Sequence, residues 1–225
     1  MDVIIEVKEK LKRKHQILFD KKSLFLQDLI FLISEQNHKV LTLWALDLAL
    51  ELVNYLEEKY PNEDRFRIAL NKTKLWAQGE IKMPEAKRAI LNCHAVAKEL
   101  TNKEDIALCH AIGQACGVVH TVGHAIGLPI YELTAIVYEY GIDNCKDKLI
   151  NRKKEYIEKI YYYQEHYKEY KKWAKFYEKN WVNSQFFLLY SNINISFISS
   201  GLSWQPLLSH FFIIAVSPFL KNSIW

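Results

Sequence analysis

The apolar positions of residues 1 to about 180 recur every three to four residues, which is the period of a helix that buries one face. The pattern predicts a series of helices joined by short connections, a length that favours antiparallel packing of neighbours. The expected helices cover about 3–19, 23–33, 35–59, 63–78, 84–100, 103–127, 129–140 and 144–181. We therefore predict an all-α fold, a compact multi-helix bundle with a long charged C-terminal helix.

Cap and turn residues indicate where several of these helices begin and end. Ser34 and Asn62 are expected to cap the helices that follow them, and Asn102 is a third cap. Gly79 suits the position just after a helix, and Pro84 suits the first turn of the next one. The seven glycines and five prolines of the 225 residues are too few for a turn-rich all-β fold.

The composition changes abruptly after Trp181. Residues 182–225 carry a single charge, Lys221, and are rich in Phe, Ile, Leu, Ser and Asn. Apolar and polar residues alternate over 192–197, which is a strand period. We therefore divide the chain into a helical bundle domain, 1–181, and an uncharged hydrophobic tail of undetermined structure.

Charge and cysteine usage restrict the class of protein. The net charge of +4 is mild and does not by itself indicate nucleic acid. The four cysteines form no CxxC pair, and the chain begins with no secretion signal, so we expect a reduced, cytoplasmic protein. No apolar run is long enough for a membrane span.

A stripe of histidine and glycine marks the predicted helix 103–127. Its members follow one another at intervals of 3, 4, 3, 4 and 3 residues, which places them on one helix face. An interior glycine costs a helix about 1 kcal/mol relative to alanine, so a neighbouring helix, a ligand or a metal is expected to come close. The members are His110, Gly113, Gly117, His120, His124 and Gly127.

Two interpretations of this stripe stay open. The glycine pairs 113/117 and 123/127, which include Gly123, favour a close helix crossing with buried, hydrogen-bonded histidines. Alternatively, His120 and His124 lie one turn apart and can chelate zinc, nickel or iron, with His94 among the candidate third ligands. No HExxH or ExxH motif supports the metal, so close packing is our preferred interpretation, with no assigned metal or other cofactor.

Asp47 is a carboxylate in an otherwise apolar helical stretch, so it must be paired. Arg65, Arg67 or a histidine of the stripe is the expected partner. No nucleophile motif stands nearby, so a structural ion pair is favoured over a general base, and we assign no catalytic residue. The candidate buried polar cluster or pocket consists of Trp44, Asp47, Arg65, Trp76, His94, His110, Gln114, His120 and His124.

The segment 146–179 holds 11 Lys/Arg and 6 Asp/Glu, interleaved with seven tyrosines. Basic residues among aromatic ones occur on surfaces that bind single-stranded nucleic acid. Here, however, opposite charges recur at helical spacing and no RNA- or DNA-binding signature is present. A solvated helix face, open to a protein partner, is the preferred interpretation.

Several blocks of the sequence resemble the immunity protein family of bacterial polymorphic-toxin systems. They are the Trp–Asp element at 43–49, Tyr-Pro with Asp-Arg at 60–65, Trp-Ala-x-Gly at 76–79, and the later His-Ala and Gly/His blocks up to 127. The resemblance covers about 35–141. This chain departs from the family pattern at Phe66, where a proline is expected, and in its tail.

The resemblance implies a helical, cytosolic protein that binds and neutralises a cognate toxin rather than an enzyme. We expect the toxin to contact the face formed by 146–179 and the loop 60–67. A homo-oligomer is also compatible with the sequence. The alternative is a metal- or small-ligand-binding helical protein, or an enzyme, that uses the His120/His124 face.

Overall fold

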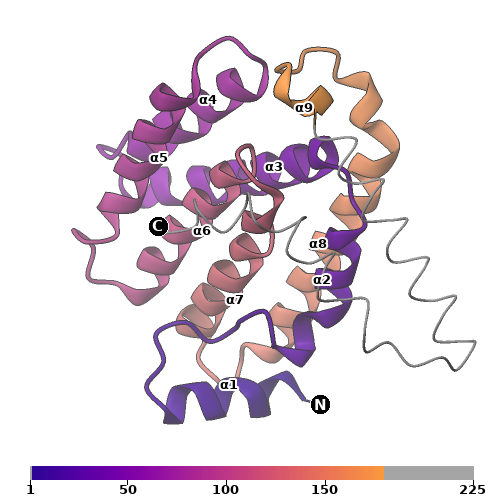
Figure 1. Cartoon of the computed structure of the whole chain (residues 1–225). Helices are drawn as coiled ribbons and strands as arrows, with labels where there is room; N and C mark the ends of the chain where they lie inside the picture. Colours follow the sequence, from indigo (N-terminus) through magenta and orange to yellow (C-terminus); the bar gives the residue numbers. More distant parts are fainter. Residues whose placement is uncertain (1, 180–225) are drawn as a thin grey trace, which may run out of the picture. The chain divides into compact units, whose positions relative to one another are not determined.

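The computed structural model describes residues 2–179, and the predicted tail at 182–225 lies outside the described residues. The described part is a bundle of nine α-helices with three short 3-10 segments and no strand, so the predicted all-α class is confirmed (Figure 1). The helices are α1 (Val3–Lys12), α2 (Gln27–Ser34), α3 (His38–Lys59), α4 (Arg65–Ala77), α5 (Met83–Val96), α6 (Lys103–Gly117), α7 (Gly127–Tyr140), α8 (Lys146–His166) and α9 (Phe176–Lys179). The 3-10 segments are η1 (Leu24–Leu26), η2 (Val122–His124) and η3 (Tyr167–Glu169).

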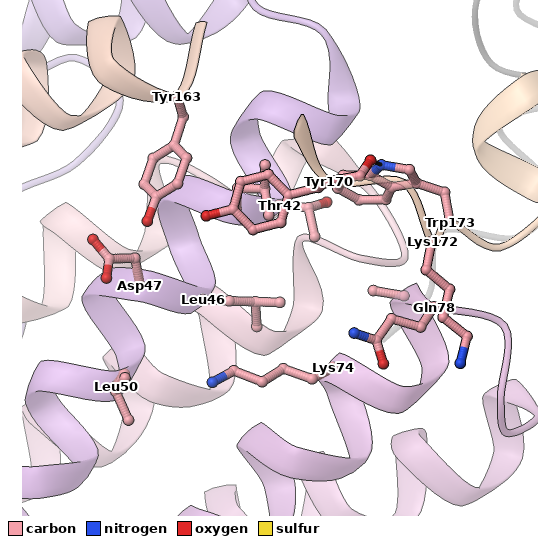
Figure 2. A pocket seen from close by; sticks show the side chains of 12 residues that line it. Thr42, Leu46, Asp47, Leu50, Lys74, Gln78, Tyr163, Tyr170, Lys172 and Trp173 are labelled. Carbon is pink, nitrogen blue, oxygen red and sulfur yellow. Dashed lines mark hydrogen bonds between the residues drawn. The ribbon is translucent and has the colours of Figure 1, made fainter. Parts of the chain in front are cut away.

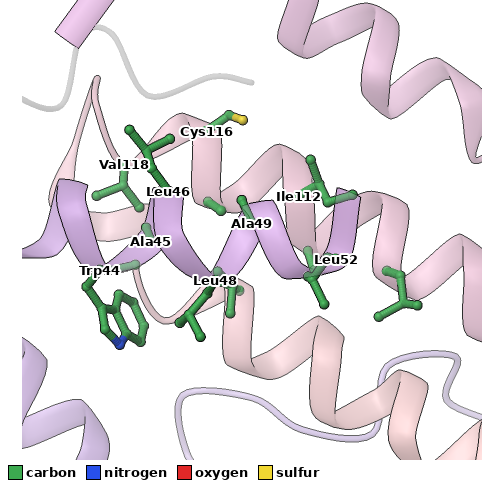
Figure 3. Close-up of a cluster of buried hydrophobic side chains, with 14 of the residues drawn as sticks. Trp44, Ala45, Leu46, Leu48, Ala49, Leu52, Ile112, Cys116 and Val118 are labelled. Carbon is green, nitrogen blue, oxygen red and sulfur yellow. The ribbon is translucent and has the colours of Figure 1, made fainter. Parts of the chain in front are cut away.

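Helix α3 is the centre of this bundle and contacts α4, α6 and α8. Half of its residues are buried, and a polar row at 47, 51, 54 and 58 follows its remaining face. Trp44 and Leu48 have no exposed surface. Figure 3 shows α3 alongside α6, with Ala49 near Ile112, whereas Trp44 and Leu48 point away from α6. Each fully buried leucine contributes about 1.5–3 kcal/mol to stability.

The predicted single helix 103–127 is wrong, because the chain reverses direction within it. Helix α6 ends at Gly117, whose carbonyl accepts hydrogen bonds from the amides of His120 and Thr121 at 2.9 and 3.2 Å. Thr121 is extended, with φ −153°, and α7 begins at Gly127. Helices α6 and α7 form an antiparallel hairpin, so the histidine and glycine stripe is folded back on itself.

The long C-terminal helix is also shorter than predicted. Helix α8 ends at His166, and residues 170–175 then run without helix before the single turn α9. The amide of Ala174 donates to the carbonyl of Ala77 at 2.8 Å, and the hydroxyl of buried Tyr177 lies 2.8 Å from Thr42 Oγ1. Packing of this segment on α3 and α4 replaces the helix that the charge pattern predicts.

The helix caps are predicted in part. Asn102 accepts from the amide of Glu104 at 2.8 Å, and Gly79 has φ +78° just after α4, both as expected. Asn37, rather than Ser34, caps α3, with its side chain 3.0 Å from the amide of Val40. Residue 64, rather than Asn62, is the N-cap of α4.

The first helix is shorter than the predicted 3–19. It ends at Lys12, and Lys14 then adopts a positive φ of 59°. The chain beyond Lys14 enters the core, where Leu18 and Phe19 are buried. The amide of Leu18 donates to Thr134 Oγ1 at 3.1 Å. Burial of this apolar pair, which a helix would turn partly to solvent, sets the end of α1.

All four cysteines are unpaired and buried. Cys109 Sγ donates to the carbonyl oxygen of Cys93 at 3.0 Å, and burial raises the pKa of Cys116 to about 11. Buried thiols of this kind behave as small apolar groups. Across residues 2–179, the helices are too short or too polar for any of them to cross a membrane.

Candidate functional site

A pocket of about 290 Å³ opens between α3, α4 and the segment that follows α8 (Figure 2). Helix α3 contributes Thr42, Leu46 and Asp47 to its lining, and α4 with its C-terminal end contributes Lys74 and Gln78. This volume is at the lower limit for a drug-sized ligand, so it suits a single side chain or a small group.

The remaining wall of the pocket is aromatic. It consists of Tyr163 near the end of α8, then Tyr170 and Trp173 from the segment after η3. The segment that carries this wall packs closely on Gly79. A Cβ at residue 79 would lie 3.2 Å from the Cα of Ala174. Glycine is therefore needed at this position for two reasons, the positive φ and the close approach of the aromatic segment.

Asp47 is partly buried in the pocket, and its partner is Lys159 of α8, which also binds Glu51 at 2.9 Å. The predicted partners of Asp47, the arginines of α4 and the stripe histidines, are therefore wrong. The predicted ion pair itself is present. Burial and the negative charge of Asp47 raise the pKa of Tyr163, which keeps its hydroxyl protonated at neutral pH.

Lys74 reaches the same pocket from α4 and is partly buried (Figure 2). Within residues 2–179 its ammonium forms no ion pair and no hydrogen bond. Lys172, across the pocket, is paired with Glu80. The pocket therefore holds one ammonium without a counter-ion among the described residues.

The predicted histidine cluster is present in part and lies away from this pocket. His94 of α5 and His110 of α6 face each other, with their Nδ1 atoms 3.1 Å apart, and His110 packs on the ring of Tyr131. Gly113 makes room for them, because a Cβ there would lie 2.2 Å from the His94 ring. Burial lowers the pKa of His94 to about 4, so the ring is neutral at physiological pH.

His124 is held by Gln114, whose Oε1 lies 2.8 Å from its Nδ1. The His124 ring lies against Gly117, where a Cβ would be 2.9 Å from it. The Gln114 side chain lies against Gly127, where a Cβ would be 2.4 Å from Oε1. All three glycines of the stripe thus admit polar side chains, whereas Gly123 lies outside the stripe. A Cβ at Gly123 would meet one atom within 4 Å, Thr121 Oγ1 at 3.8 Å.

His120 is exposed and stacks on Trp76, with ring centroids 6.3 Å apart. His124 is turned toward Gln114 instead, so the two histidines do not share the helix face that a chelate would use. In the range 2–179, no three His, Cys, Asp or Glu side chains are grouped in a way that could hold a metal ion.

Two further residues of the predicted cluster lie elsewhere. Trp44 is fully buried, and its indole donates to the carbonyl of Tyr156 at 3.0 Å. Arg65 binds Glu63 and, at 2.6 Å, Glu99. The structure therefore divides the predicted cluster into the pocket at Asp47, the histidine pairs of α5, α6 and η2, and separate structural contacts.

The sequence gives little signal for the rest of the pocket. Lys74 and Gln78 stand among ordinary surface residues of α4, and Tyr170 and Trp173 were assigned to a helix that does not extend so far. The one available signal is the density of tyrosine and tryptophan after Tyr156. These residue types are enriched where proteins bind one another.

The fold and the pocket define a helical protein with an aromatic, lysine-bearing surface. The sequence profile of the Imm-5 like putative immunity protein family matches residues 32–159. The chain belongs to this family. No curated protein and no solved structure matches this chain.

Proposed function

We propose that this protein is an immunity protein that binds a toxin protein and blocks it by direct contact. The observation that carries the proposal is the family match, which spans α3 to most of α8. It includes the sides of the pocket formed by α3 and α4, whereas the aromatic wall at 163–173 lies beyond it. Immunity by contact needs a stable interface, of about 800 Å² on each partner, with a few well-placed anchor residues.

The aromatic surface around the end of α8 supports the proposal. Tyr161 and Tyr162 expose 53% and 52% of their surface, and Tyr170 beside the pocket exposes 44%. Tyr162 stacks on His166, with ring centroids 4.2 Å apart, so it is already ordered. Rigid, exposed tyrosines lose little entropy on binding and are frequent anchors of interfaces.

We further propose that the protein acts in the cytoplasm. Its four cysteines are unpaired and buried, which fits a reducing compartment. The protein would then bind the toxin inside the cell. The loop 60–67 is the second proposed contact region, although Arg65 and Arg67 there are already paired with glutamates.

Co-expression with the toxin encoded beside it tests the proposal. The wild-type protein should restore growth and co-purify with the toxin. The double variant Tyr161→Ala/Tyr162→Ala should lose most of the binding, whereas Tyr140→Ala, a tyrosine 37% exposed at the end of α7, should not. Failure of the wild-type protein to bind or protect against any toxin encoded nearby would refute the proposed function.

A further inference from the structure

We infer that the pocket between Asp47 and Lys74 receives a carboxylate side chain of the partner, with Lys74 as its counter-ion. The inference rests on the proposed function, since the carboxylate is taken to belong to the toxin. It goes further by naming the pocket as the contact point and an acidic residue as the group recognised.

The balance of charge inside the pocket carries the first step. Asp47 is neutralised by Lys159, and Lys172 is neutralised by Glu80. Lys74 has no counter-ion among residues 2–179, so water must solvate its ammonium in the free protein. A partner that covers the pocket removes this water, and the ammonium then needs an anion to offset its desolvation.

The shape of the pocket carries the second step. Figure 2 shows the hydroxyl groups of Tyr163 and Tyr170 directed toward the end of the pocket at which Asp47 lies, and the ammonium of Lys74 extending toward the same end from α4. The pKa of Tyr170 is raised, first by burial, so its hydroxyl remains a hydrogen-bond donor at neutral pH. A carboxylate has two acceptor oxygens, which suits one ammonium and one hydroxyl in a space of about 290 Å³.

The rim of the pocket carries the third step. Residues 168–175 contain four lysines and one glutamate, and the ammonium of Lys39 lies 5.4 Å from the centre of the Trp173 ring. This excess of positive charge attracts an acidic surface and raises its rate of encounter. The rim and the pocket therefore favour the same partner chemistry.

Phosphate is the other anion that such a rim attracts, but the pocket favours a carboxylate. Nucleic-acid backbones are neutralised by several cations in a row. Here the pocket holds a single ammonium without a counter-ion among residues 2–179, and its other charged groups are already paired. A phosphate, with its greater charge and size, is less suited to this place than one carboxylate.

The first test measures the affinity for the toxin by calorimetry. Lys74→Gln should weaken binding about 10- to 100-fold, because it leaves the carboxylate of the partner buried without its counter-ion. Lys74→Glu should weaken it further. The matched controls Lys8→Gln and Lys8→Glu, at an exposed lysine of α1 outside both proposed contact regions, should bind within about threefold of wild type. Wild-type affinity in Lys74→Gln would overturn the inference and leave the proposed function intact.

The second test needs no toxin. The indole N–H of Trp173, which donates to the carbonyl of Tyr170, serves as an NMR reporter during titration with an acetylated hexa-aspartate peptide. The inference predicts a saturable shift that is lost in Lys74→Gln and absent with hexa-lysine. No shift, an unchanged shift in the variant, or a larger response to a hexathymidine oligonucleotide would overturn it. If the toxin fails to bind the wild-type protein, the proposed function fails, and this titration alone decides whether the pocket takes a carboxylate.

Discussion

Replacing Gly113 with alanine should destabilise the protein, although the same change in a helix interior is ordinarily stabilising. An alanine Cβ would lie 2.2 Å from both Cε1 and Nε2 of His94. Non-bonded carbon atoms are ordinarily about 3.5–4.0 Å apart, so the ring must move by more than 1 Å. It is not free to do so, because its Nδ1 lies 3.1 Å from Nδ1 of His110.

The size of the effect follows from two opposed contributions. Overpacking of a filled interior costs about 1–3 kcal/mol, and the higher helix propensity of alanine offsets about 1 kcal/mol of this. We expect a net loss of up to about 2 kcal/mol in the free energy of unfolding. For a protein of this size, 1 kcal/mol corresponds to about 2–4 °C in Tm.

Urea denaturation followed by circular dichroism measures the loss. Gly123→Ala is the control, because its Cβ meets only Thr121 Oγ1 at 3.8 Å, and it should change stability by less than about 0.5 kcal/mol. In a His94→Ala background, Gly113→Ala should become stabilising. A Gly113→Ala protein more stable than wild type would refute the close approach of the imidazole.

Two further predictions concern buried polar groups. Burial lowers the pKa of His94 to about 4 and also lowers the pKa of His110, so the unfolded chain binds more protons than the folded one below pH 6.5. The free energy of unfolding should therefore fall as the pH drops from about 6.5 to about 5, by up to about 1.4 kcal/mol per pH unit for each proton. Equal urea midpoints at pH 7 and pH 5 would contradict the burial of these histidines. Glu132→Ala should cost about 3–5 kcal/mol, because it removes the most buried of the three carboxylates that pair with Arg152 and leaves the buried hydroxyl of Tyr156 without its acceptor. Glu155→Ala, which removes an exposed partner of the same arginine, should cost at most about 1 kcal/mol, and equal losses in the two variants would contradict the difference in burial.

Local signals in the sequence were sufficient for most of the helices. Apolar spacing and helix caps depend on neighbours within a few residues. The structure confirms the predicted cap at Asn102, whereas α3 and α4 are capped by residues other than Ser34 and Asn62. The hairpin at Gly117 was missed because His and Gly at intervals of three and four fit a straight helix as well as a folded one. The preferred interpretation was that the stripe glycines admit a neighbouring helix, whereas all three admit polar side chains.

The candidate site was less accessible to sequence reasoning because its contacts are distant in the chain. Asp47 was identified as a paired carboxylate, but Lys159 lies 112 residues away and nothing local distinguishes it from other lysines of α8. The aromatic wall depends on the hydrogen bond between the amide of Ala174 and the carbonyl of Ala77, which are far apart in the sequence. Tertiary packing overrides local propensity at this place.

Hydrogen exchange of the protein, alone and bound to the toxin encoded beside it, tests the central claim most directly. The account predicts that the toxin slows exchange of backbone amides in residues 163–175 and around Lys74, where the pocket and its aromatic wall lie. Residues 103–117 of α6, already buried in the bundle, should change little. Protection confined to the His120/His124 region, with none at 163–175, would contradict the account.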